Sequence, residues 1–206
     1  MAALSAFAKF VRPSVPGCPE PVLLDGILRA CIEYCTRTKS ITQDVSVITA
    51  ASTNGYAIPV SSGYEPVEVN RVMRSGYDLD PSSLNEAHQM RLTQRNDMPR
   101  VFWMDENNLL QFAPTPNAIE TLEVIAAVTP SMAATSVPDA LLSNTRYDAI
   151  CAGARAFLMA LPKVEWSDLK QSAVDRAAFQ AAIEKEILKR ARGGSHKPLR
   201  TKSSFY

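Results

Sequence analysis

The apolar residues of this chain of 206 residues follow a helical period at both ends and a strand period in the middle. In residues 20–38, and again beyond residue 130, they recur every three or four positions, which is typical of helices with one buried face. Between residues 41 and 130 they alternate in short runs separated by turn residues, which predicts antiparallel strands. This order predicts an α+β fold, in which a helical bundle formed from both ends of the chain carries an inserted antiparallel β-sandwich-like region and an extended C-terminal tail. The expected parts are 1–40 and 131–192 for the helical domain, 41–130 for the β-rich domain and 193–206 for the tail.

The first long helix is expected over residues 20–38, because Pro19 and Pro21 suit its first turn. Its apolar side is made of six residues: Leu24, Ile27, Leu28, Cys31, Tyr34 and Cys35. Four residues of alternating charge also recur at every fourth position: Asp25, Arg29, Glu33 and Arg37. Pairs at this spacing stabilise a helix by about 0.2–0.5 kcal/mol each. The charged set is either a solvated face or a face that meets its counterpart on a neighbouring subunit.

In the middle region we expect six strands: near 45–49, 56–60, 66–74, 100–104, 109–113 and 120–129. Asn54-Gly55, between the first two, is typical of the turn of a β-hairpin. The segment from Asp80 to Leu84 indicates a helix of one or two turns.

Two helices are expected in the C-terminal third. The first is expected to start at Asp139, just after Pro138, to have a helical apolar period from Leu141 to Leu161 and to end at Pro162. Its small residues at 152–154 allow another helix to approach closely. The second opens at Trp166-Ser167-Asp168 with Ser167 as its N-cap, and reaches Arg192 before Gly193-Gly194.

The residues that carry chemistry form no convincing catalytic pattern. The sequence contains no phosphate-binding loop, no GxSxG and no HExxH motif. His88 lies in a polar connecting segment, where a surface histidine is favoured over a general base, so a hydrolase centred on it is a remote alternative. Asp78 and Asp80 suit turn and cap roles, and Cys31 and Cys35 would need two further ligands to bind zinc. We expect no enzyme, no cofactor and no metal site.

The chain also lacks the patterns of membrane insertion and secretion. No run of about 18 uncharged apolar residues is present, and the N-terminal stretch does not resemble a signal peptide. We therefore expect a soluble protein made in the cytoplasm.

The charge of the chain is divided unevenly. Residues 187–206 hold six basic residues and no acidic one, whereas the rest of the chain holds 16 basic and 21 acidic residues. As a nucleic-acid arm, this end would neutralise phosphates and bind in a salt-sensitive way. As a docking arm, it would become ordered on a protein partner, and the terminal Phe205-Tyr206 favours this interpretation because aromatic residues anchor interfaces. A tail without function is the third possibility.

In its order of motifs the chain resembles the head-to-tail adaptor (connector) proteins of tailed bacteriophages. The resemblance covers nearly the whole chain. The matching segments are Phe10–Pro13, Val15–Pro19, Ile32–Arg37, Val67–Val72, Leu109–Pro116, Val137–Asp139, Tyr147–Ala154 and Leu161–Asp168.

The resemblance implies a structural virion protein at the head–tail junction that is not an enzyme. Proteins of this kind form a homo-oligomeric ring, commonly of twelve copies, beneath the portal protein, and hold the tail nozzle or tail fibre proteins. Double-stranded DNA passes through the ring without sequence-specific binding, and no membrane is involved. The C-terminal segment of such proteins docks on the portal, which implies this role for six residues here: Arg192, Lys197, Arg200, Lys202, Phe205 and Tyr206.

Overall fold

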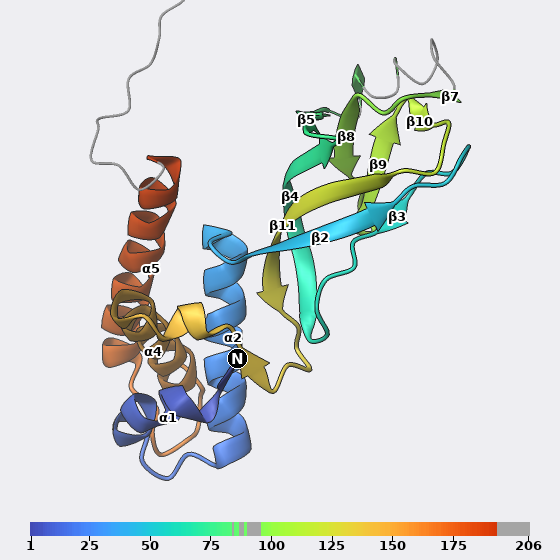
Figure 1. Cartoon of the computed structure of the whole chain (residues 1–206). Helices are drawn as coiled ribbons and strands as arrows, with labels where there is room; N and C mark the ends of the chain where they lie inside the picture. The colour runs from blue at the N-terminus through green and yellow to red at the C-terminus, as the bar shows by residue number, and fades with distance from the viewer. Residues whose placement is uncertain (84, 87–88, 90–95, 193–206) are drawn as a thin grey trace, which may run out of the picture. The chain divides into compact units, whose positions relative to one another are not determined.

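Figure 1 shows the computed structural model of the protein, which describes residues 1–83, 85–86, 89 and 96–192. Helices and mainly antiparallel sheets are both present, so the predicted α+β class is confirmed. The chain divides into two compact units. We call Met1–Ser40 with Thr135–Tyr206 the helical unit, and Ile41–Ala134 the sheet unit.

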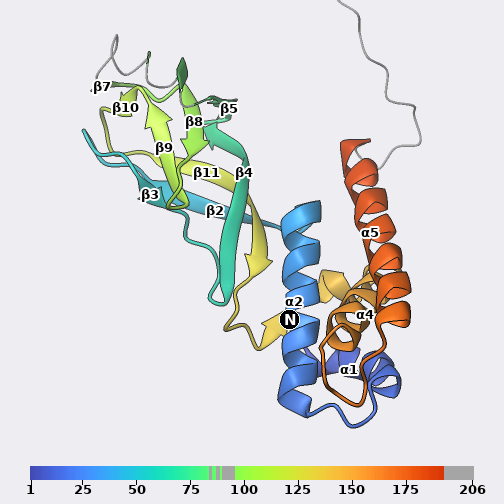
Figure 2. The same cartoon turned by 180° about the vertical axis from the view of Figure 1, so that it is seen from behind.

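Four α-helices of the helical unit are described, with two short 3₁₀ turns and a two-stranded pairing of chain segments near its ends. The helices are α1 (Ser5–Val11), α2 (Glu20–Thr38), α4 (Asn144–Met159) and α5 (Leu169–Ala191). The 3₁₀ turns are Arg12–Ser14 and Asp139–Leu142, and the paired strands are β1 (Ala2–Ala3) and β12 (Ser136–Val137). Figure 2, seen from behind, and Figure 1 agree in showing α2, α4 and α5 side by side.

The helix predicted over residues 20–38 is confirmed as α2. Pro19 caps it in an extended conformation, and Lys39 ends it in the left-handed conformation with φ of 50°. Of the six residues predicted for its apolar side, five are buried and Leu24 is half-buried, while Leu23 is fully buried.

Two glycines allow the three long helices to pack closely. A Cβ added at Gly153 would lie 3.0 Å from the ring of Phe179, so the predicted close approach at 152–154 is confirmed, with α5 as the partner helix. A Cβ at Gly26 would lie 2.8 Å from the side chain of Leu158, so α2 and α4 meet in the same way. The core of the helical unit therefore depends on side chains that fill the space left by missing Cβ atoms.

The predicted starts of the last two helices need correction. A helical turn does begin at Asp139, as predicted, but it is a separate 3₁₀ turn over Asp139–Leu142, and the α-helix itself begins only at Asn144. The N-cap of α5 is Asp168 instead of Ser167, because Asp168 is extended and its Oδ1 accepts hydrogen bonds from the N–H groups of Lys170 and Gln171, both at 3.0 Å. The Ser167 hydroxyl instead donates to the Met159 carbonyl oxygen at 3.2 Å.

The sheet unit consists mainly of two four-stranded sheets. The first has the order β2 (Thr42–Ile48), β11 (Thr121–Pro130), β4 (Tyr64–Arg74) and β5 (Tyr77–Asp78). The second has the order β3 (Tyr56–Ala57), β9 (Leu109–Ala113), β8 (Val101–Met104) and β6 (Asp80–Pro81). Residues of both sheets form one hydrophobic core, with Val72 and Leu122 from the first and Leu110 and Phe112 from the second. Two short pairings, β6 with β8 and β7 (Asn96–Asp97) with β10 (Thr115–Pro116), are parallel, unlike the antiparallel pairing that the sequence predicts.

The hairpin predicted at Asn54-Gly55 is wrong. The flanking strands belong to different sheets, since β2 pairs with β11 and β3 pairs with β9. The side-chain amide of Asn54 instead bonds the backbone of Phe112: its Nδ2 donates to the carbonyl oxygen at 2.8 Å, and its Oδ1 accepts from the N–H at 2.9 Å. This side chain thus replaces backbone pairing that a hairpin would supply.

The helix predicted at residues 80–84 also needs correction, because Asp80–Pro81 form strand β6 and residues 82 and 83 are not helical. The nearest helix-start signal lies at Ser83, whose N–H donates to Glu86 Oε2 at 3.3 Å while its hydroxyl oxygen accepts from the Glu86 N–H at 3.4 Å. Such reciprocal bonds form a capping box. Leu84 and His88 lie outside the described residues.

Within the described ranges, no helix has the length and apolar character needed to cross a membrane.

Candidate functional site: the end of the last helix

The C-terminal end of α5 leads into the predicted docking arm, of which the structure describes only Arg192. Four residues of α5 are buried: Ser172, Asp175, Phe179 and Ile183. None of its residues after Ile183 is buried. Figures 1 and 2 show its last turns extending past α4. Ile187 and Leu188 on these turns are 40% and 50% exposed. The helix therefore leaves the apolar core about two turns before it ends.

Polar contacts attach α5 to the helices beside it. Arg155 on α4 makes two hydrogen bonds to the Asp175 carboxylate, at 2.8 and 3.1 Å. Arg176 makes two to the Glu33 carboxylate on α2, both at 2.7 Å. Paired contacts of this kind fix orientation as well as contributing energy.

Beyond Ile183, two polar contacts come from one side of α5. Glu186 accepts a hydrogen bond from Arg146 Nη2 at 2.6 Å, and its side chain is only 13% exposed. Arg190 Nη1 donates to the Thr38 carbonyl oxygen at the end of α2, at 3.4 Å. Tyr34 lies beside the first of these pairs, and burial, followed by the charge of Glu186, raises the pKa of its hydroxyl to about 12. The side of α5 that carries residues 186 and 190 is thus fixed to the rest of the helical unit.

The other side of this end is open and carries the exposed Glu184 as well as two lysines. Lys185 and Lys189 are exposed, and among the described residues neither makes an ion pair. Glu186 is the last acidic residue of the chain. The open side of this end therefore presents Leu188 among exposed side chains of both signs of charge.

Of the six predicted docking residues, only Arg192 is described. It is exposed and caps α5, with its N–H donating to the Leu188 carbonyl oxygen at 3.1 Å. The other five, Lys197, Arg200, Lys202, Phe205 and Tyr206, lie outside the described residues. Docking by these residues stays a prediction.

The charged stripe on α2 forms the i,i+4 pairs expected of it, with Arg29 to Asp25 at 2.8 Å and Arg37 to Glu33 at 3.4 Å. Glu33 is shared with Arg176 of α5 in the same chain. The period of a single helix could not reveal this contact, because the two residues are 143 positions apart.

Two of the cysteines singled out in the sequence are held by packing, and Asp78 is held by an ion pair. Cys31 and Cys35 are buried, and burial raises the pKa of both thiols, that of Cys35 to about 12. Arg71 makes two hydrogen bonds to Asp78, at 2.6 and 2.9 Å, and thereby lowers the pKa of this carboxyl. Within the described part of the chain, no three His, Cys, Asp or Glu side chains are grouped so that they could hold a metal ion.

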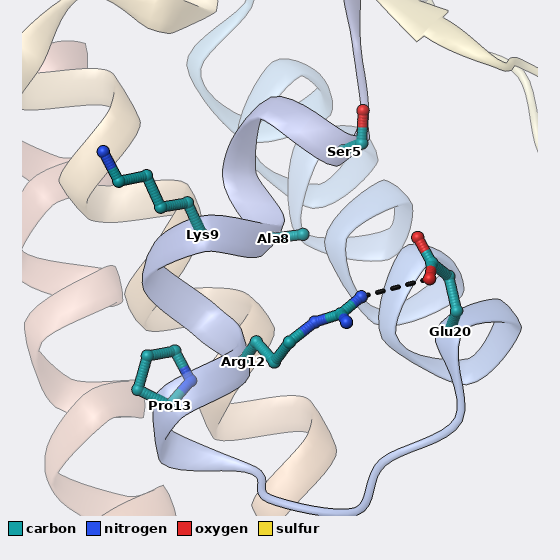
Figure 3. Close-up of a pocket in the computed structure, with 6 residues that line it drawn as sticks. All are labelled: Ser5, Ala8, Lys9, Arg12, Pro13 and Glu20. Carbon is teal, nitrogen blue, oxygen red and sulfur yellow. Dashed lines mark hydrogen bonds and ion pairs between the residues drawn. The ribbon is translucent and has the colours of Figure 1, made fainter.

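A hollow of about 430 Å³ lies between α1 and the start of α2. Figure 3 shows Arg12 and Glu20 reaching toward each other along it, with Arg12 Nη2 3.1 Å from Glu20 Oε2, while Lys9 points to the opposite side. The remaining lining residues are Ser5, Ala8 and Pro13. The two charges neutralise each other, and the arrangement offers no pair of groups for acid–base catalysis.

The sequence reasoning missed the contacts that orient the end of α5, namely Arg146 with Glu186 and Arg190 with the carbonyl of Thr38. It also did not single out Ile187 and Leu188. Two adjacent large apolar residues inside an otherwise basic segment were the available signal for these.

The chain matches the SU10 adaptor protein family over residues 6–202 and belongs to that family. The family consists of phage head-to-tail adaptors, so the resemblance identified from the sequence motifs is confirmed. A search of curated proteins finds no match. The protein is therefore a structural adaptor of a bacteriophage, a virion component at the head–tail junction, from a family that is generally without enzymatic activity. Its family implies oligomeric assembly and association with portal and tail proteins.

Proposed function

We propose that the protein forms a ring, of twelve copies, that joins the portal protein to the tail nozzle or tail fibre proteins and extends the DNA channel. Membership of the SU10 adaptor family is the observation that carries this proposal. In it, residues 1–40 and 131–192 act as one helical body, residues 41–130 meet other tail parts, and residues 193–206 dock on the portal together with Arg192.

The helical unit has the properties that a ring body needs. Helices α2, α4 and α5 pack closely at Gly26 and Gly153. One ion pair joins α5 to α4, and another joins α5 to α2. A close-packed body of this kind keeps its shape under load. The position of α5, with its end outside the core, supports a docking role for the segment that follows.

The charge of the chain supports passage of DNA without binding. The residues before 187 hold 21 acidic and 16 basic residues. An acidic channel wall repels phosphates, so double-stranded DNA would move through it without sequence-specific contacts.

The mass of the protein in solution, alone and mixed with the portal protein of the same phage, tests this function. We expect a ring on the portal, observed by light scattering and electron microscopy, and we expect removal of residues 193–206 to leave a folded chain that no longer attaches. A full chain that does not associate with the portal would overturn the proposal.

The basic end also supports a second candidate, a nucleic-acid-binding module. Six basic residues without an acidic one are the observation in its favour. It predicts that the isolated chain binds duplex DNA with a steep dependence on salt. Absence of binding at low salt would eliminate it.

A further inference from the structure

Strand β2 lies at one edge of the first sheet of the sheet unit, with β11 as its neighbour. The Ile41 carbonyl oxygen accepts from the Val128 N–H at 2.9 Å, and the Thr49 N–H donates to the Glu120 carbonyl oxygen at 2.8 Å. Because every second residue of an antiparallel strand bonds its neighbour, the odd-numbered residues of β2 bond β11. The backbone N–H and C=O groups of the even-numbered residues therefore point away from β11, and these residues are Thr42, Asp44, Ser46 and Ile48. We call these four residues the β2 edge.

The outward backbone groups of the β2 edge are unpaired. Within the described residues, no group bonds to them, and all four side chains are exposed. Two residues further on, the fold satisfies the same positions: the Tyr56 hydroxyl lies 3.1 Å from the backbone nitrogen of Ala50 and 3.0 Å from its carbonyl oxygen. The open edge thus ends where Tyr56 begins to cover the backbone.

Strand β2 also lacks the usual features that prevent an edge from pairing. Proteins protect exposed edges with prolines, bulges, lysines or very short strands. Strand β2 has seven residues, none of them proline or lysine, and its register with β11 runs without a shift. An edge of this kind is a template for one more strand.

We infer that the β2 edge binds an extended segment of a tail protein, which pairs with it as a fifth strand of the sheet. This inference rests on the proposed function, since it assigns the residues and the partner chemistry by which residues 41–130 meet the tail. Backbone hydrogen bonds supply affinity in this mode of recognition, and the side chains beside the edge select the sequence.

The acidic side chains beside the β2 edge favour a basic residue in the bound segment. Glu123 lies opposite Ser46 in the register, so its side chain shares a face of the sheet with that of Asp44. Both carboxylates are exposed, and in the described part of the chain neither makes an ion pair. A hollow of about 290 Å³ has Asp44, Ser46 and Glu123 among its lining residues. A lysine or arginine of an added strand would complement these charges.

The far end of the β2 edge favours an apolar residue. Ile48 is 66% exposed, and Ile119 is 77% exposed. The two lie on adjacent segments, because the Thr49 hydroxyl bonds the carbonyl oxygens on either side of Ile119, at 3.1 and 3.2 Å. An added strand that covers them removes apolar surface from water. The bound segment therefore carries a basic residue near Asp44 and a large apolar residue near Ile48.

A tail protein fits this edge better than the same strand of a second copy. Pairing of β2 with β2 about a two-fold axis would close a dimer, whereas the proposed function requires a ring. It would also bring together two edges that each carry Asp44 and no basic residue. The β2 edge is therefore complementary to a chain with basic residues, which β2 itself lacks.

Titration of the full-length protein with the purified tail nozzle protein, and separately with the tail fibre protein of the same phage, tests the inference. Ser46→Pro removes one outward N–H of the β2 edge and leaves the bonds between β2 and β11 in place. Its matched control, Ser46→Ala, keeps this N–H. Asp44→Asn and Ile48→Ala test the two side chains, with the exposed Glu106→Gln and Val174→Ala as controls elsewhere in the chain. Unchanged thermal unfolding of each variant verifies the fold.

We expect Ser46→Pro to weaken binding to one of the two tail proteins about tenfold or more, and Ser46→Ala to stay within about twofold of the wild type. Asp44→Asn should weaken binding and reduce its salt dependence, and Ile48→Ala should weaken binding without changing this dependence. If Ser46→Pro binds like Ser46→Ala, the inference is wrong, while the proposed function stands because the chain still joins the tail. A wild type that binds neither tail protein would overturn the inference together with the tail-joining part of the proposed function.

Hydrogen exchange of the wild type adds a measurement that needs no variant. The N–H groups of the β2 edge should exchange quickly in the free chain and slowly in the complex, whereas those of Val45 and Val47 should exchange slowly in both. Slow exchange of the β2 edge in the free chain would overturn the inference. Self-association of the wild type that Ser46→Pro abolishes would assign the edge to a second copy and would overturn it as well.

Discussion

Replacing Ile183 and Leu188 separately by alanine compares two aliphatic side chains that lie five residues apart on α5. Ile183 is fully buried, whereas Leu188 is 50% exposed. Ile183→Ala removes three buried carbon atoms, at about 0.8 kcal/mol each, and leaves a cavity, so we expect a loss of about 3–4 kcal/mol in the free energy of unfolding. Leu188→Ala removes half-exposed carbons without leaving a cavity, and we expect a loss of about 1 kcal/mol or less.

Urea unfolding of the full-length variants, followed by circular dichroism at a helical wavelength, measures both losses. The slope of the unfolding free energy against urea should be the same in both variants, so that the midpoints can be compared directly. A loss for Leu188→Ala as large as that for Ile183→Ala would refute the reasoning, because the end of α5 would then be packed instead of projecting. A loss below about 1 kcal/mol for Ile183→Ala would refute the anchoring of α5 at this residue.

Two further predictions concern the cores of the two units. Burial raises the pKa of Tyr34 to about 12 from its ordinary value of 10, so between these values the unfolded chain releases the proton while the folded protein keeps it, and stability falls as pH rises through this window. Tyr34→Phe should make the fall of the unfolding free energy with pH shallower, as measured by urea unfolding at pH 9.5–11.5. The control Tyr77→Phe, at an exposed tyrosine, should leave this fall unchanged. An equal fall with pH in both variants would contradict the raised pKa of Tyr34. In the sheet unit, Asn54→Ala removes both hydrogen bonds to the backbone of Phe112 and should cost about 1–3 kcal/mol, while Asn117→Ala, an exposed control, should stay within about 0.5 kcal/mol. A midpoint for Asn54→Ala equal to that of its control would rule out this role.

Local patterns predicted the helices well, because their determinants lie within a few residues. The prolines at the start of α2 and the three- and four-residue apolar period fix its limits. The small residues around Gly153 indicated a close helix contact, although its partner, the ring of Phe179, could be known only from the structure.

The failed predictions share a physical reason: more than one residue or strand could fill the same role, and the choice between them depends on contacts outside the local sequence. Ser167 and Asp168 are both good caps, and the sequence cannot tell which of them takes the extended conformation that capping requires. Asn54-Gly55 has the composition of a hairpin turn, but the strands on either side pair with more distant strands and leave the Asn54 amide to bond Phe112.

The candidate site could be predicted only in part. The charge composition indicated the C-terminal end as the candidate docking site, because counting charges along the chain requires no knowledge of the fold. The orientation of α5 depends on Glu33 with Arg176 and on Glu186 with Arg146, and these contacts join residues 143 and 40 positions apart. Such pairs leave no periodic trace in the sequence.

A cryo-electron microscopy map of the full-length protein assembled on the portal protein of the same phage tests the central claim most directly. The account predicts a ring in which the end of α5, with the residues that follow Arg192, lies against the portal. A ring whose portal contacts come from the sheet unit, with the end of α5 facing away, would contradict it.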